Sequence, residues 1–90
     1  MTKAELVRQI AEETGQNADT VLTIIEGFMK ATRNCLVNGD NLYLRGFGTF
    51  ATKERAAKKA RDISKGTTIE IPAHMVPTFK PSPEFKEMLK

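Results

Sequence analysis

The residues best suited to chemistry form a basic run that begins at Lys53 and ends at Arg61. Five of these nine residues are cations and a single one, Glu54, is an acid. Alternate residues of an extended chain point to the same side, so a strand here would align four cations, Lys53, Arg55, Lys59 and Arg61. Such a row can follow a phosphate backbone and release its counterions. The pattern favours a nucleic-acid ligand over the alternative of a merely solvated charged face.

Charge is distributed unevenly along the chain, whose net charge is +3. Residues 1–40 carry four basic and six acidic side chains, whereas residues 51–81 carry seven basic and three acidic ones. A slightly acidic part joined to a concentrated basic segment indicates a scaffold combined with a part that binds polyanions.

Residues for catalysis or metal binding are scarce. Cys35 is the only cysteine and His74 the only histidine, so we expect neither a zinc cluster nor an intrachain disulfide. The sequence contains neither a nucleophile-elbow motif nor a pattern of paired carboxylates. Residues 46–51 match the dinucleotide pattern G-x-G-x-x-A, but the segment after them lacks the apolar stripe of the helix that such a site needs. We therefore expect no catalytic residue, no metal, no cofactor and no small-molecule substrate.

Two amphipathic helices are expected in the N-terminal part. Thr2 and Glu5 form a capping box at the start of the first helix, and Gly15 is suited to its C-terminal end. Asn17 can cap a second helix, which has one broad apolar stripe and ends at the turn over residues 38–41.

This helix pair could also be a helix-turn-helix DNA reader. A recognition helix presents basic residues near its start, however, and the only cations of the second helix, Lys30 and Arg33, come late in it. We therefore interpret the second helix as a core or dimer helix, in which Cys35 is a small buried residue.

Strands are expected in the rest of the chain. Residues 42–45 and 67–71 alternate polar and apolar side chains as strands do, and Pro72 and Pro77 must then lie at an edge or a bulge. Residues 51–61 are ambiguous. Their Ala, Lys, Glu and Arg residues favour a helix by intrinsic propensity, but they include no large apolar residue that could dock such a helix on a core.

Phenylalanines mark the expected core of the C-terminal half. Gly46 and Gly48 allow a tight turn or a bulge, so that Phe47 and Phe50 pack inward, and Phe79 returns to the core. Ser82 and Pro83 open a short final helix. Three of its residues are predicted to point inward: Phe85, Met88 and Leu89.

Ninety residues make at most one domain with a limited core. Without disulfides or metals, oligomerisation is the remaining means of stabilising it. Residues 1–5 contain no apolar signal segment, and no stretch approaches the roughly 18 apolar residues of a membrane span. Together with an unpaired thiol, this predicts a reducing, cytoplasmic location without membrane contact.

Four motifs carry a resemblance to a known family. They are Gly46-Phe47-Gly48-Thr49-Phe50, Lys53-Glu54-Arg55-Ala56-Ala57, Ile69-Glu70-Ile71-Pro72-Ala73 and Val76-Pro77-Thr78-Phe79-Lys80-Pro81. With them, the whole chain resembles the HU and integration host factor family of bacterial histone-like proteins. The resemblance implies an α+β fold and an intertwined dimer, with a helical dimerisation body, a short antiparallel sheet and a protruding two-stranded β-arm. Residues 1–90 would form a single DNA-binding domain, with the body at 1–50 and 77–90 and the arm at 51–76, against the helix propensity of residues 51–61.

The resemblance also implies which residues bind DNA. In the arm these are Arg55, Lys58 and Arg61, to which the charge run adds Lys59. On the saddle of the sheet they are Lys53 and Lys80, and on the body they are Lys3 and Lys86. Phe47, Phe50 and Phe79 match positions of the family's dimer core.

The arm tip, where residues 62–66 are predicted to form a turn, departs from the family pattern over residues 60–63. The family usually shows Gly-Arg-Asn-Pro, whose proline wedges between base pairs, whereas this chain has Ala60-Arg61-Asp62-Ile63. Isoleucine is also a suitable apolar wedge, so Ile63 is predicted to insert. In the alternative interpretation Ile63 rests on the neighbouring arm strand.

The sequence therefore predicts a non-enzymatic homodimer, or a heterodimer with a paralogue, that binds double-stranded DNA in the nucleoid. Little sequence preference is expected, because the minor groove presents a degenerate pattern, and binding would bend and compact the DNA. Three alternatives are a sequence-selective DNA-bending protein like integration host factor, an RNA-binding protein and a nuclease. The short termini favour the HU-like interpretation over the first of these.

Overall fold

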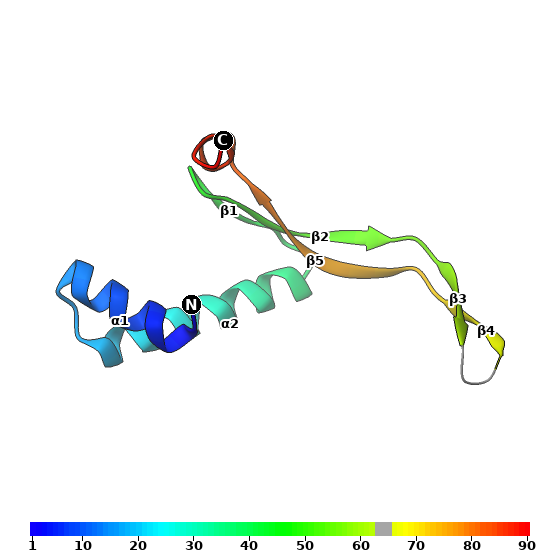
Figure 1. Cartoon of the computed structure of the whole chain (residues 1–90), viewed down its shortest axis with the longest axis horizontal. Coiled ribbons are helices and arrows are strands. Elements are labelled where there is room, and N and C mark those ends of the chain that lie inside the picture. Colours follow the sequence, from blue (N-terminus) through cyan, green and yellow to red (C-terminus); the bar gives the residue numbers. More distant parts are fainter. Residues whose placement is uncertain (63–65) are drawn as a thin grey trace. The chain divides into compact units, whose positions relative to one another are not determined.

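Three helices and five strands follow one another in the computed structural model, which describes residues 1–62 and 66–90. They are α1 (Lys3–Thr14), α2 (Ala18–Val37), β1 (Leu42–Leu44), β2 (Gly48–Arg55), β3 (Lys58–Asp62), β4 (Thr67–Ile71), β5 (His74–Pro81) and α3 (Pro83–Glu87). The predicted α+β class is confirmed (Figure 1). The chain forms two compact units, Met1–Cys35 and Leu36–Lys90. Among the described residues, no helix is long and apolar enough to cross a membrane.

The ends of α1 and α2 follow from their capping residues. The Thr2 hydroxyl accepts a hydrogen bond from the Glu5 amide at 3.2 Å, and Gly15 ends α1 in the left-handed conformation at φ 74°. The Asn17 side chain accepts from the Asp19 amide at 2.7 Å, at the start of α2. These bonds satisfy amides that have no partner within the helix, and they confirm the predicted boundaries.

The first unit has a small core. Val7 of α1 and Val21 of α2 are buried, and an ion pair of 2.9 Å joins Lys3 to Glu26. The apolar stripe of α2 is only partly covered within the chain, because Ile24 is 64% and Phe28 42% exposed. An apolar face of this kind gains free energy when another surface covers it.

The second unit is built on an antiparallel sheet with the order β1-β2-β5. Strands β2 and β5 continue into the hairpin of β3 and β4 (Figure 1). We call residues 51–76 of this hairpin the arm. Residues 51–55 and 58–61 are thus in strands, so the helix propensity of residues 51–61 is overridden by pairing with the strands that follow. Pro77 lies on the edge strand β5, where a missing amide is tolerated.

A cluster of four phenylalanines packs at the base of the sheet. The ring of Phe79 lies 4.8 Å from that of Phe50 and 5.1 Å from that of Phe47, and Phe47 stacks on Phe85 at 5.5 Å. A Cβ on Gly48 would lie 2.5 Å from the Phe79 ring and from the Lys80 carbonyl oxygen. Gly48 is therefore required for this close approach, as Gly46 is for its left-handed turn at φ 82°.

Some predictions about burial were wrong. Met88 and Leu89 are 82% and 79% exposed, because both follow the end of α3 at Glu87 and the helix packs on the other phenylalanines through Phe85. Cys35 is partly exposed rather than buried. Phe47, predicted to point inward, is 45% exposed although its ring contacts two others.

Candidate nucleic-acid interface

The pairing register places three predicted DNA-binding cations on one face of the sheet. Lys53 pairs with Val76, Arg55 with His74, and Thr49 with Lys80. Residues directly opposite in an antiparallel pair share a face, and alternate residues along a strand share it too. Lys53, Arg55 and Lys80 therefore form one row, and all three side chains are exposed.

The ladder is interrupted where the arm leaves the sheet. After the pair Arg55–His74 it resumes at Lys58–Ile71, so that Ala56-Ala57 and Pro72-Ala73 are left out of it. Pro72 has no amide hydrogen to donate, which explains the break. The pairing register is the same on both sides of the break, and in the hairpin Lys59 is opposite Glu70 and Arg61 is opposite Thr68.

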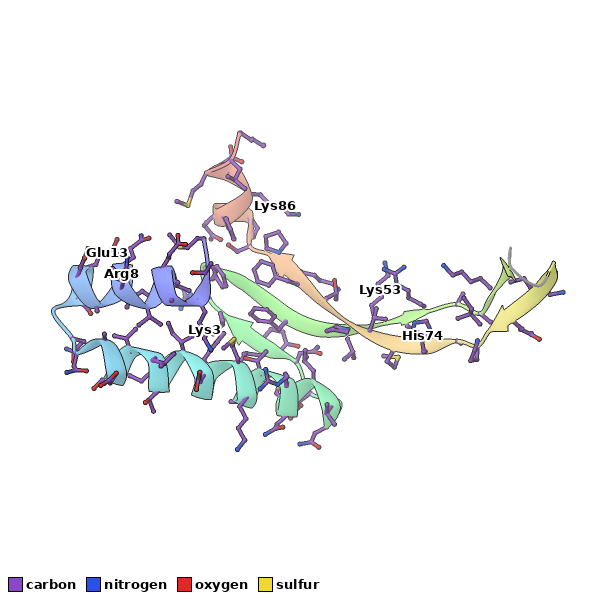
Figure 2. All side chains as sticks on the ribbon, turned by 60° about the horizontal axis from the view of Figure 1, so that its bottom comes forward. Lys3, Arg8, Glu13, Lys53, His74 and Lys86 are labelled. Atoms are coloured by element: carbon purple, nitrogen blue, oxygen red, sulfur yellow. The ribbon has the colours of Figure 1, made fainter. Side chains whose placement is uncertain are left out.

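An open hollow of about 800 Å³ lies at this interruption. We call it the arm hollow. Its lining residues come from both sides of the break: Lys53, Glu54, Arg55, Ala56, Lys58, Ile71, His74 and Val76. Strict alternation would place Lys58 on the face opposite to Arg55, but the break brings both to the same hollow. Lys53 and His74 lie on neighbouring strands of the arm in Figure 2.

The cations of the arm hollow are available to a ligand. Lys53, Arg55 and Lys58 are exposed, and none of them forms an ion pair with a described carboxylate. Lys59 is also exposed, but it stands opposite Glu70 in the hairpin. A cluster of three unpaired cations around one hollow produces a positive potential that attracts an anion.

The remaining basic residues lie on helices and on the sheet. Lys80 is on β5 and is exposed. Lys86 is on α3 and is also exposed (Figure 2). Lys3 on α1 is about half exposed and engaged with Glu26. Its role as a DNA contact stays a prediction, as does the dimer-core role of Phe47, Phe50 and Phe79.

The arm tip falls only partly within the described residues. Asp62 still pairs with Thr67, so β3 continues one residue into the segment that was predicted as a turn. Ile63, the predicted wedge, lies outside the described residues. Its role is therefore a prediction.

His74 is a residue of this region to which the sequence analysis assigned no role. It is exposed on β5, opposite Arg55. Its ring Nδ1 lies 3.1 Å from the Pro72 carbonyl oxygen. Within the described part of the chain, no group of three or more His, Cys, Asp or Glu side chains is placed to hold a metal ion.

A helical unit, a small antiparallel sheet and a cationic hairpin arm define a class of small basic α+β proteins. The chain belongs to the bacterial DNA-binding protein family, which matches residues 1–90.

Known proteins of similar sequence and structure agree with this assignment. The chain is 37% identical over 90 residues to DNA-binding protein HU of Geobacillus stearothermophilus, with 100% of both chains covered. It is 37% identical over 87 residues to DNA-binding protein HU 1 of Bacillus subtilis strain 168, covering 97% of this chain and 95% of that protein. An Anabaena HU–DNA cocrystal structure matches with a TM-score of 0.94 and 30% identity, covering 99% of this chain and 97% of that chain.

Proposed function

We propose that the protein is a non-enzymatic architectural protein that binds double-stranded DNA without marked sequence preference, and that it bends and compacts the DNA in the cytoplasmic nucleoid. The observation that carries this proposal is the arm hollow, where Lys53, Arg55 and Lys58 gather and form no ion pair with a carboxylate of the described residues. The solved HU relative that resembles this chain over nearly its whole length was crystallised with DNA.

The chemistry of the arm suits the backbone of a duplex more than its bases. Lysine and arginine side chains neutralise phosphates, and this contribution to affinity is independent of sequence. In the minor groove the base edges present a degenerate pattern, so cations there distinguish sequences weakly. A wedge such as Ile63 would add bending by partly unstacking one base step.

The working form in this proposal is a homodimer, with a paralogue as an alternative partner. The chain alone exposes 7564 Å², whereas a folded monomer of its mass exposes about 5,200 Å². The extended arm contributes to that excess, and so do exposed apolar side chains such as Ile24 and Phe28. A second copy that covered the apolar face of α2 would join the incomplete hydrophobic cores of the two protomers into one core. Residues 1–90 of each protomer would then be part of a single domain.

A mobility-shift series with linear, nicked and pre-bent duplexes of unrelated sequences tests the proposal. We expect similar affinities for all linear sequences, tighter binding to nicked and bent duplexes, and a steep fall in affinity with salt. Preference for one linear sequence would favour the alternative, a sequence-selective protein like integration host factor. Equal or tighter binding to an RNA duplex of the same length would contradict the proposal.

A further inference from the structure

The hydrogen bond of His74 determines which of its two nitrogens can meet a ligand. A carbonyl oxygen only accepts hydrogen bonds, so the Nδ1 atom that lies 3.1 Å from the Pro72 carbonyl must carry a hydrogen. In the neutral ring the single N–H proton is therefore on Nδ1, and Nε2 has a lone pair. No described residue is hydrogen-bonded to Nε2.

This tautomer makes His74 a poor phosphate ligand when neutral and a good one when protonated. The lone pair of Nε2 is repelled by an anionic phosphate oxygen, whereas a protonated ring presents an N–H donor with a positive charge. Histidine is also the side chain that ordinarily changes its charge between pH 5 and 8.

The arm hollow places several charged groups around His74. Three cations line the same hollow, namely Arg55 and Lys53 of β2 and Lys58 of β3, and a single acid, Glu54 of β2, also borders it. The neighbours from β4 and β5 are the uncharged Ile71 and Val76. A phosphate bound in the hollow would neutralise these cations and favour the protonated ring, which can donate to it.

We propose that His74 is a further DNA ligand in the arm hollow, which binds a backbone phosphate in its protonated form and so couples DNA binding to proton uptake. This inference rests on the proposed DNA-binding function. The sign follows from linkage, because the bound state holds more protons than the free state and affinity must rise as pH falls. One phosphate partner favours the charged form about tenfold or more, so each arm should gain about tenfold in affinity between high and low pH.

The test measures binding of the intact protein to one duplex by fluorescence anisotropy between about pH 5.5 and pH 8.5 at constant salt, spanning the range in which histidine titrates. Calorimetry in two buffers of different ionisation enthalpy gives the proton uptake directly. His74→Gln removes the titrating group, His74→Arg keeps a fixed charge, and Met75→Gln changes the neighbouring residue on the opposite face of β5 as a matched control.

We expect affinity to rise about tenfold per arm as pH falls in the wild type and in Met75→Gln. His74→Gln should bind weakly and His74→Arg tightly at every pH, with no proton uptake in either. A wild type without pH dependence, or a His74→Gln variant that keeps it, would overturn the inference. In both of those cases a steep salt dependence would leave the proposed function intact, whereas loss of DNA binding at all pH values would overturn both.

Discussion

Lys58 and Lys59 are adjacent in β3 and carry the same charge, but the structure places them differently. Lys58 lines the arm hollow with Arg55 and His74, whereas Lys59 stands opposite Glu70 across the hairpin. Opposite charges in directly facing positions of a sheet partly neutralise each other. We therefore expect Lys58→Ala to weaken DNA binding more than Lys59→Ala.

Counterion release gives the size of the difference. Each phosphate contact contributes about 0.9 to the slope of log K against log salt, so the loss of Lys58 from both arms of a dimer should flatten the slope by about 1.8. Between 1 M and 0.1 M salt this corresponds to about 60-fold in affinity. Lys59→Ala should flatten the slope by less than about 0.9, because Glu70 already offsets much of its charge.

Anisotropy titrations of one duplex between about 50 and 200 mM salt measure both slopes. Thermal unfolding is the control, and it should be nearly unchanged in both variants because both side chains are exposed and neither forms an ion pair with a carboxylate of the described residues. Equal slopes for the two variants, or a larger change for Lys59→Ala, would refute the assignment of Lys58 to the DNA-binding side of the arm.

Three further predictions concern packing, assembly and bending. Gly48→Ala places a Cβ 2.5 Å from the Phe79 ring and the Lys80 carbonyl oxygen, so the variant should lose about 1–3 kcal/mol of unfolding free energy. A calorimetric Tm equal to that of the wild type would count against the close approach. Sedimentation at micromolar concentration should show a dimer, and a folded monomer there would exclude the proposed assembly. Ile63→Ala should reduce DNA bending and the preference for nicked over linear duplex, while affinity for linear duplex stays nearly unchanged. If bending in a ligation-based assay and the ratio of affinities for nicked and linear duplex are both unaffected, Ile63 is not a wedge.

The local elements of this protein were predictable because their signals act over a few residues. Thr2, Asn17 and Ser82 each cap the helix that begins beside them, and Gly15 ends α1 in the left-handed conformation. The basic run was equally visible, since the clustering of cations does not depend on conformation. The family resemblance added the arm, which the helix propensity of residues 51–61 would have hidden.

What the sequence by itself determined is therefore the charge of the arm and the boundaries of the helices. Only the tertiary structure decided which cations meet. Register depends on pairing between residues far apart in the chain, and the break at Pro72 changes the simple alternation of faces. That break brings Lys58 to the same hollow as Arg55, and the register places His74 opposite Arg55. No local propensity specifies these neighbours, because each depends on the pairing of two strands that are separated in the sequence.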